Sequence, residues 1–169
     1  GRILWQQGFP LEPYPKHNYN TFSSGSPAVD GEPVYASWTM PSRYSIVALD
    51  HSGKVVWEKN LGRYKSQHGG GTSPVVYNRT VVLGNDQEGE CFIICLVAWT
   101  GETRWKSPRK TKEVAYATPC IYEDKKAGAA WIFSSEAHGF TALDPGTGKV
   151  LWELGDLFDQ AYLVRSHRG

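Results

Sequence analysis

The sequence predicts an all-β chain, a β-propeller of four-stranded antiparallel blades, from three observations. A Gly–Trp pair with fixed internal spacing recurs at Gly1/Trp5, Gly53/Trp57, Gly101/Trp105 and Gly148/Trp152. The successive glycines stand 52, 48 and 47 residues apart, and a Ser-Pro or Thr-Pro pair keeps step with them at Pro27, Pro74 and Pro119. Between these landmarks lie short runs rich in β-branched and aromatic residues, without the 3.6-residue periodicity of a long amphipathic helix.

Each repeat contains four such runs, separated by the Gly, Asp, Asn and Ser residues that mark turns. In the first repeat the expected strands cover residues 27–29, 33–38, 44–49 and 54–57. In the second they cover 74–77, 80–84, 91–96 and 103–105, and in the third 119–122, 130–134, 140–143 and 149–152. Four strands in a unit of about 40–50 residues is the size of a propeller blade.

The repeats divide the chain, taken as one propeller segment over residues 1–169, into pieces 1–10, 23–62, 69–109, 114–155 and 156–169. The first piece is expected to be the last strand of a preceding blade, and the last piece to lead into a further blade. Because closed propellers have about four to eight blades, the sequence predicts an incomplete propeller with about three full blades. Open blade edges attract partners, so we expect a protein partner or self-association into a homo-oligomer.

The stretch 146–149, Gly-Thr-Gly-Lys, looks like the end of a phosphate-binding loop but is better interpreted as a turn. The leading glycine of such a loop would fall at Leu143, the following Ser or Thr would fall at Val150, and a strand follows instead of a helix. In a hairpin turn, Gly148 would supply a positive φ and Asp144 would accept hydrogen bonds from backbone N–H groups. Trp152 would then offer a large flat surface to a neighbouring blade.

Stretches 48–57 and 142–152 resemble the pyrroloquinoline quinone (PQQ)-like repeat, with its pattern of Ala-x-Asp, a turn, Gly-Lys, two apolar residues and Trp. The residues that carry the full match are Ala48, Asp50, Gly53, Lys54, Trp57, Ala142, Asp144, Gly148, Lys149 and Trp152. Gly1, Trp5, Gly101 and Trp105 keep the glycine and the tryptophan. The middle repeat departs from the pattern, because Cys95 and Val97 replace Ala and Asp, and Glu102 replaces Lys.

This resemblance implies propellers of about eight blades, found both in quinoprotein dehydrogenases and in a BamB-like, non-enzymatic outer-membrane assembly lipoprotein. It also implies a periplasmic or secreted location, and a tryptophan that locks consecutive blades together. On that basis Trp57→Ala or Trp152→Ala is expected to cost about 3–5 kcal/mol, as for a buried aromatic side chain.

Any binding function is expected on the face that holds the loops between second and third strands, 39–43, 85–90 and 135–139, together with the crossovers between blades. Varied loops on a rigid scaffold are where binding sites usually lie. The candidate residues on this face are Arg43, His68, Gly69, Tyr116, Glu136 and His138. Asp86, Glu88 and Glu90 are candidates for holding a cation through oxygen ligands. The alternative for the crossover residues is a structural role where the chain is crowded near the propeller axis. The alternative for the three acidic residues is a solvated surface loop.

The sequence shows no Cys-Cys pair, no Cys-x2-Cys and no His-Glu-x2-His. The related dehydrogenases hold PQQ with a vicinal disulfide, a Ca2+ cradle and an acidic base, so we expect no catalytic site and no cofactor in this segment. The leading hypothesis is a non-catalytic propeller scaffold. One alternative is a segment of a PQQ- and Ca2+-dependent oxidoreductase whose active site lies in other blades. Another is a carbohydrate-binding propeller that uses Tyr14, Tyr19, Trp38 and Tyr64.

Charge and cysteine content set the remaining limits. A formal net charge of +1, from 18 basic and 17 acidic residues, does not favour nucleic acid or an anionic membrane as the main partner. The longest apolar run, residues 91–99, is too short to span a bilayer, and no basic-then-apolar leader opens the chain. If Cys91 and Cys95 share a strand, they stand about 13 Å apart. Since a disulfide needs Cα atoms within about 7 Å, both are expected to be buried thiols, like Cys120.

Overall fold

The computed structural model describes residues 1–14, 25–31, 33–66, 68–111 and 114–155, and within them every regular element is a β-strand. The first sheet contains β1 (Ala28–Val29), β2 (Val34–Met40), β3 (Arg43–Leu49) and β4 (Val55–Asn60). The second contains β5 (Val75–Tyr77), β6 (Thr80–Asn85), β7 (Phe92–Val97) and β8 (Thr103–Pro108). The third contains β9 (Cys120–Asp124), β10 (Gly128–Ser135), β11 (Gly139–Leu143) and β12 (Val150–Leu154).

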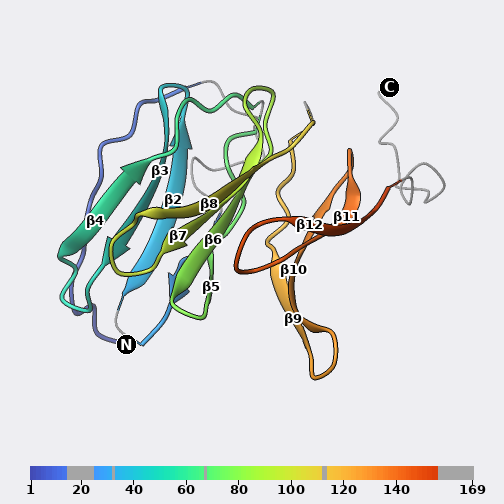
Figure 1. Cartoon of the computed structure of the whole chain (residues 1–169). Helices are drawn as coiled ribbons and strands as arrows, with labels where there is room; N and C mark the ends of the chain where they lie inside the picture. Colours follow the sequence, from blue (N-terminus) through green and yellow to red (C-terminus); the bar gives the residue numbers. More distant parts are fainter. Residues whose placement is uncertain (15–24, 32, 67, 112–113, 156–169) are drawn as a thin grey trace.

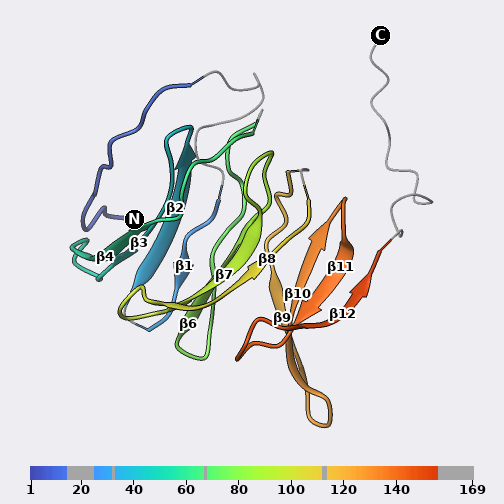
Figure 2. The same ribbon diagram turned by 45° about the horizontal axis from the view of Figure 1, so that its top comes forward.

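Each sheet is an antiparallel meander in which the strands pair in chain order. The three sheets lie side by side in chain order like the sectors of a fan (Figures 1 and 2), and the innermost strands β1 and β5 contact each other. The predicted all-β architecture of four-stranded propeller blades is therefore confirmed. In the described part of the chain, no helix has the length and apolar character needed to cross a membrane.

The core fills the two spaces between neighbouring blades. One cluster joins the first and second blades through residues such as Ile46, Tyr44 and Leu96, and another joins the second and third through Trp131, Phe133 and others. Strand β7 contributes to both clusters, because its alternate side chains point to opposite faces. A strand buried on both faces reads as a continuous apolar run, which explains the sequence of residues 91–96.

A β-bulge recurs at the same place in all three blades. The register shifts between Ala48 and Leu49 in the first blade, and at the equivalent positions in the second and third. Next to each shift, a small residue pairs with the tryptophan of the outer strand, as Ala48↔Trp57, Cys95↔Trp105 and Ala142↔Trp152. The second blade thus keeps the motif's geometry with cysteine in the alanine position, since both side chains are small.

The turn between third and fourth strands is braced by aspartate in the first and third blades. The Asp144 carboxylate accepts hydrogen bonds from the backbone N–H groups of Gly146 and Thr147 at 3.0 and 2.8 Å, and from the Thr147 hydroxyl at 2.7 Å. Asp50 accepts equivalent bonds in the first blade. In the second blade Val97 occupies this position, and its N–H still bonds the Glu102 carbonyl, as the Asp144 N–H bonds that of Lys149. Residues 144–149 therefore form a strand-connecting turn.

This brace predicts a pH-dependent contribution to stability. The hydroxyl of Thr147, assisted by backbone N–H groups, holds the pKa of Asp144 below its ordinary value. Because the folded pKa is depressed, the contribution is complete above the unfolded pKa of about 3.9 and is lost as the pH falls through the folded value. In acid unfolding titrations, the stability difference between wild type and Asp144→Ala should be constant at neutral pH and shrink below pH 4. A difference that stays constant through acid pH would contradict the brace.

The repeated tryptophans join each blade to the next through a contact that we call the staple. The indole Nε1–H of Trp57 donates to the Ala98 carbonyl in the second blade at 2.8 Å, and that of Trp105 donates to the Pro145 carbonyl in the third at 2.9 Å. Each ring lies on the glycine of the following repeat, Trp57 on Gly101 and Trp105 on Gly148. A hydrogen bond and a ring contact therefore join the outer strand of one blade to the turn of the next.

Two separate features disfavour any residue other than glycine at these motif positions. Gly101 has a φ of +69°, a conformation that disfavours residues with a Cβ atom. A Cβ atom built on Gly101 would also lie only 2.7 Å from the Trp57 ring. The same two constraints hold at Gly53, where φ is +85° and the ring belongs to Trp5. The glycine and the tryptophan of the motif are thus contact partners across successive repeats.

Replacing Gly101 with alanine is expected to lower the free energy of unfolding by about 2–4 kcal/mol, since the backbone penalty and the clash with Trp57 add. Gly128 is the matched control, because its φ is +84° but nothing lies within 4 Å of its would-be Cβ atom. Gly128→Ala should therefore show only the backbone penalty of about 1–2 kcal/mol. Urea unfolding of both variants measures the difference, and equal losses would show that the ring contact adds no constraint.

The N-terminal residues 1–14 lie against the first blade on its outer side (Figure 2). Trp5 packs on Gly53, and Phe9 stacks on Trp38 with ring centroids 4.6 Å apart. The sequence predicts a last strand of a preceding blade over residues 1–10, but in the structure these residues pair with no strand. Trp5 nevertheless occupies the position that the staple requires. The expected lead into a further blade, residues 156–169, lies outside the described residues.

The third blade presents an apolar face on the side away from the second blade. Strand register places Phe140, Ala142, Trp152 and Leu154 on this face, because Ala142 pairs with Trp152 and Phe140 with Leu154. Its equivalent in the second blade is covered by the third blade. Trp152 is consequently 48% exposed, whereas Trp105 is 8% exposed.

Candidate functional site

The loops between second and third strands and the crossovers between blades lie at one end of the blades, which we call the loop face (top of Figure 1). The turns after β3, β7 and β11 lie at the opposite end, the turn face. On the loop face, the β6–β7 loop is tied to the first crossover by Gln87. Its side-chain oxygen accepts from the Lys65 N–H at 2.7 Å, and its amide donates to the Arg63 carbonyl at 3.0 Å. No pattern in the sequence marks this glutamine as buried.

The three acidic residues of the β6–β7 loop form three separate ion pairs. Asp86 pairs with Arg109 at 2.8 Å, Glu88 with Lys65 at 3.2 Å and Glu90 with Lys106 at 2.6 Å. In the described ranges, no group of three or more His, Cys, Asp or Glu side chains is arranged to hold a metal ion. Each carboxylate of the candidate cation site is therefore directed to its own cationic partner.

The Asp86–Arg109 pair is the centre of a buried polar cluster between the second and third blades. The two side chains are 9% and 4% exposed. The Arg109 guanidinium also donates to the hydroxyls of Ser135 at 2.7 Å and Thr141 at 3.2 Å, both in the third blade. Burial raises the pKa of Asp86, while the charge of Arg109 opposes that shift. One arginine thus connects two blades through three side chains.

His138 extends this cluster toward the surface. Its Nδ1 lies 3.0 Å from the Glu153 carboxylate, which also accepts from the Thr141 hydroxyl at 3.1 Å. His138 Nε2 is buried without a hydrogen-bond partner among the described residues. A cavity of about 220 Å³ adjoins the cluster and is lined by Arg109, Lys110, His138, Glu153 and neighbouring residues.

A second group of candidate residues lies where the crossover from the first to the second blade meets the crossover from the second to the third. The hydroxyls of Tyr116 and Ser66 are 3.2 Å apart, and the rings of His68 and Tyr116 meet edge to face with centroids 6.3 Å apart. The Gly69 carbonyl accepts from the hydroxyls of Tyr64 and Ser66, each at 3.4 Å. His68, Gly69 and Tyr116 are therefore brought together although the sequence separates Gly69 and Tyr116 by nearly one repeat.

The remaining candidates on this face lie apart from both groups. Arg43 forms an ion pair with Glu58 on the first blade, and Glu136 is exposed in the β10–β11 turn. Sequence reasoning missed Arg109 because a basic residue in a crossover carries no pattern that distinguishes it from a solvated one. Only the strand order, which places the crossover beside β10 and β11, brings it to Ser135 and Thr141.

The aromatic residues considered for carbohydrate binding are partly used by the fold. Tyr64 is buried and packs edge to face on Tyr44 with centroids 5.4 Å apart, and Trp38 packs on Phe9. Tyr14 lines a cavity of about 160 Å³ with Met40, and Tyr19 lies outside the described residues. All three cysteines are free thiols, and Cys91 and Cys95 are buried as predicted. Cys120 is exposed, contrary to prediction, because the face of β9 that carries it is uncovered.

Repeated four-stranded blades, stapled by a tryptophan of one repeat on the glycine of the next, define this chain as a β-propeller repeat module. A protein-family model described as "Outer membrane protein assembly factor BamB" matches residues 42–167. Because this match covers well over half of the sequence, the chain belongs to that family of PQQ-like propeller repeats. A search of curated proteins finds no match.

Solved structures with similar folds include BamB and two dehydrogenases. BamB from Moraxella catarrhalis has 22% identity and a TM-score of 0.57, and the match covers 90% of this chain and 43% of that one. A europium-containing methanol dehydrogenase has 20% identity and a TM-score of 0.57, with 78% and 24% covered. Quinohemoprotein alcohol dehydrogenase from Comamonas testosteroni has 20% identity and a TM-score of 0.53, with 76% and 26% covered. The chain spans less than half of each, and the likeness concerns the fold.

Proposed function

We propose that this chain is a non-catalytic β-propeller module that binds a protein partner through its loop face, outside the cytoplasm. One observation carries the proposal: the Asp86, His138 and Cys91 side chains on this face make contacts within the fold. Asp86 pairs with Arg109 in the interior, and His138 in the β10–β11 turn pairs with Glu153 in β12. The Cys91 thiol donates to the Gln87 carbonyl at 2.9 Å, and burial raises its pKa.

These contacts support a binding role because they hold the loops in one arrangement. A pre-ordered surface loses less conformational entropy on association than a mobile one. Tyr116 and Glu136 remain exposed on this framework, and an exposed tyrosine is a frequent anchor at protein interfaces. The description of the family as an assembly factor agrees with a protein partner and with a location beyond the inner membrane.

The alternative is a segment of a PQQ-dependent oxidoreductase. The donor set of this chain does not fit that cofactor. No two of its three cysteines are adjacent in sequence, and among the described residues no group of three or more His, Cys, Asp or Glu side chains could hold Ca2+.

Site-specific photo-crosslinking tests the proposed function. A photoreactive amino acid placed at Glu136 or Tyr116 should form a crosslink to one defined protein in cells, identified by mass spectrometry. The matched control is the same amino acid at Lys149, which is exposed on the turn face. Crosslinks from Lys149 but not from the loop-face positions would contradict the assignment of the binding face. Stoichiometric uptake of PQQ with Ca2+, followed by quinone absorbance, would contradict the non-catalytic role.

We also propose that the uncovered apolar face of the third blade promotes self-association. Trp152, Phe140 and Leu154 expose apolar surface on this face. The equivalent face of the second blade is buried against the third blade. Sedimentation velocity of the 169-residue chain should therefore show concentration-dependent dimers, and Trp152→Glu should shift the distribution to monomers. A monomer at all concentrations would contradict this second proposal without affecting the first.

A further inference from the structure

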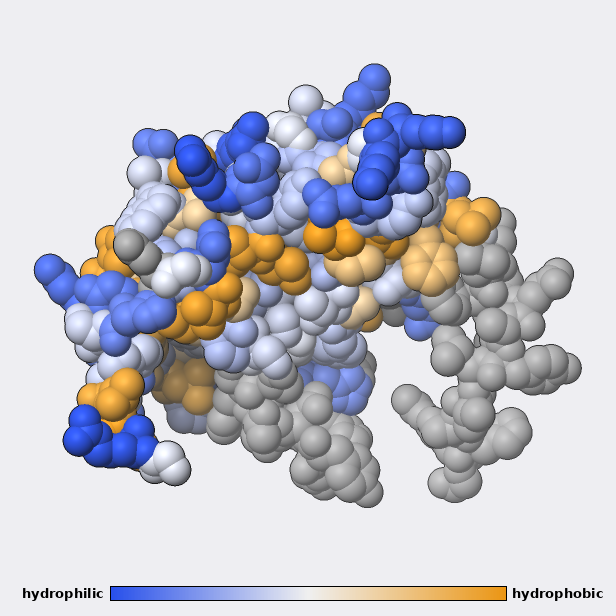
Figure 3. Space-filling view, turned by 90° about the horizontal axis from the view of Figure 1, so that it is seen from below, coloured by the Kyte–Doolittle hydropathy of each residue, from blue (hydrophilic) through white to orange (hydrophobic). Residues whose placement is uncertain are grey.

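The turn face carries several exposed apolar side chains. Figure 3 views the molecule from this side and shows an apolar band between more hydrophilic surfaces. The exposed apolar residues near the turns are Val55, Val56, Trp99, Val150 and Leu151. Four of these belong to the apolar pair that precedes the motif tryptophan in the first and third blades, Val55 and Val56 before Trp57 and Val150 and Leu151 before Trp152. Trp99 is the exception.

The fold does not need a tryptophan at position 99. The turns of the second and third blades share one conformation, since the Gly101 N–H bonds the Val97 carbonyl and the Gly148 N–H bonds that of Asp144. In this alignment Ala98 corresponds to Pro145, because each accepts a motif indole N–H. Position 99 therefore corresponds to Gly146, where no side chain is present.

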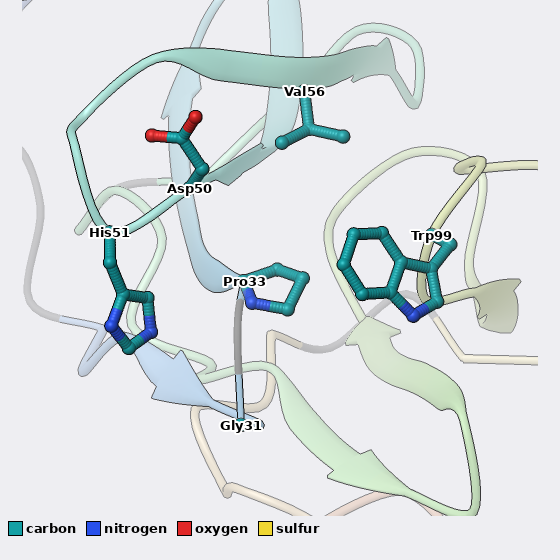
Figure 4. A pocket seen from close by; sticks show the side chains of 6 residues that line it. All are labelled: Gly31, Pro33, Asp50, His51, Val56 and Trp99. Carbon is teal, nitrogen blue, oxygen red and sulfur yellow. The ribbon is translucent and has the colours of Figure 1, made fainter.

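Trp99 is 51% exposed and borders a pocket between the first and second blades. The pocket has a volume of about 200 Å³ and is lined by Gly31, Pro33, Asp50, His51, Val56 and Trp99. Figure 4 shows Val56 and Pro33 between the Trp99 indole and Asp50, which lies on the opposite side of the pocket. Trp99 and Val56 thus form an exposed apolar patch at the edge of a pocket, and such patches mark ligand-binding grooves.

The charged wall of the pocket is anionic. The Asp50 Oδ1 atom accepts from the Ser52 N–H at 2.8 Å, the Ser52 hydroxyl at 2.6 Å and the Lys54 N–H at 3.0 Å. These bonds, led by that of the Ser52 hydroxyl, hold the pKa of Asp50 below its usual value, so the carboxylate is ionised at neutral pH. Within the described residues Asp50 forms no ion pair with Lys54 or any other cation.

We propose that the Trp99 pocket, formed by Trp99, Val56, Pro33 and Asp50, binds a lysine or arginine side chain presented by a segment of a partner protein. Such side chains combine an apolar stem with a charged head. The stem matches the surface of Val56 and Pro33, and the cation matches the indole face through a cation–π contact and the Asp50 carboxylate through charge. The pocket lies on the turn face, so this proposal is independent of the loop-face function.

The first experiment compares ligands on the unmodified chain. The capped tripeptides Ac-Gly-Arg-Gly-NH2, Ac-Gly-Lys-Gly-NH2, Ac-Gly-Leu-Gly-NH2 and Ac-Gly-Glu-Gly-NH2 are titrated into the 15N-labelled protein and followed by NMR. The arginine and lysine peptides should shift the Trp99 indole N–H and the backbone amides of His51 and Val56 saturably, and the other two should not. Equal shifts with the leucine peptide would overturn the proposed cation recognition.

The second experiment compares variants by the shifts of the His51 and Val56 amides. Trp99→Gly should weaken binding of the arginine peptide at least tenfold, and an unchanged unfolding midpoint is expected because Gly146 occupies the equivalent place. Asp50→Asn should weaken it at least threefold and reduce its salt dependence. The matched control, Asp144→Asn, alters the equivalent turn beside Gly146 and should leave binding unchanged. Full affinity in Trp99→Gly or Asp50→Asn, or equal weakening in Asp144→Asn, would overturn the proposal.

Discussion

Replacing Trp105 with alanine is expected to lower the free energy of unfolding by about 3–5 kcal/mol. The side chain is 8% exposed, its ring lies on Gly148, and its indole N–H satisfies the Pro145 carbonyl at 2.9 Å. Alanine would leave a cavity between the second and third blades and an unpartnered carbonyl. Urea unfolding followed by circular dichroism measures the loss without depending on tryptophan fluorescence.

Trp152→Ala is the matched control for that prediction. Trp152 occupies the same motif position but is 48% exposed, because no described residue covers its face of the third blade. We therefore expect a loss of less than about 1 kcal/mol, as for most surface substitutions. The repeat pattern alone predicts similar losses at Trp57 and Trp152, and the structure corrects this expectation for Trp152. Equal losses at Trp105 and Trp152 would contradict the staple.

Replacing Asp86 with alanine is expected to destabilise the chain by about 3–5 kcal/mol as well. Arg109 would then retain its charge at 4% exposure without a carboxylate partner. The hydroxyls of Ser135 and Thr141 would remain as its only hydrogen-bond partners in the cluster. A neutral hydroxyl does not compensate for burial of a guanidinium charge. Urea unfolding at neutral pH is the measurement.

The double variant Asp86→Leu/Arg109→Met separates the loss of a partner from the value of the pair. Apolar replacement of a buried ion pair is often close to neutral in stability, because the desolvation of both charges is also removed. Ser135 and Thr141 would keep partners in the His138 N–H and Glu153. We expect the double variant to be more stable than Asp86→Ala by about 2 kcal/mol or more. A double variant as unstable as Asp86→Ala would mean that the pair itself stabilises the fold.

The strands could be predicted from the sequence because both core clusters impose a regular pattern on it. Every expected strand from 27–29 to 149–152 is found, with most ends shifted by one or two residues. The outer strands extend further than predicted, as β4 does to Asn60. Residues 58–60 are polar, so their pairing with β3 leaves no apolar signal, although backbone hydrogen bonds continue the strand.

The contacts across repeats could not be predicted in the same way. The sequence indicates that a motif glycine needs a positive φ and that a motif tryptophan packs on a neighbour. It does not show that Trp57 lies on Gly101, because this pairing depends on how the blades are stacked. The same holds for Arg109 between blades and for Trp99 beside Pro33, which the chain separates by more than 60 residues.

The candidate binding residues were predicted only to share one face, and the sequence did not indicate which of them touch. His68, Gly69 and Tyr116 meet at the crossovers, since equivalent positions of successive repeats lie next to each other in a propeller. The three acidic residues of the β6–β7 loop are close in sequence but pair with three different cations, Lys65 in the first crossover, Lys106 in β8 and Arg109 directly after it. Proximity along a loop therefore did not indicate where the side chains point, because the surrounding cations decide it.

The double-mutant cycle of Trp57→Ala and Gly101→Ala tests the stapled-repeat account most directly. Gly101→Ala is measured by urea unfolding in the wild type and in the Trp57→Ala background. If the ring contact limits Gly101, its replacement in the second background should cost only the backbone penalty of about 1–2 kcal/mol seen for Gly128→Ala. An undiminished loss in the absence of the Trp57 ring would contradict the account.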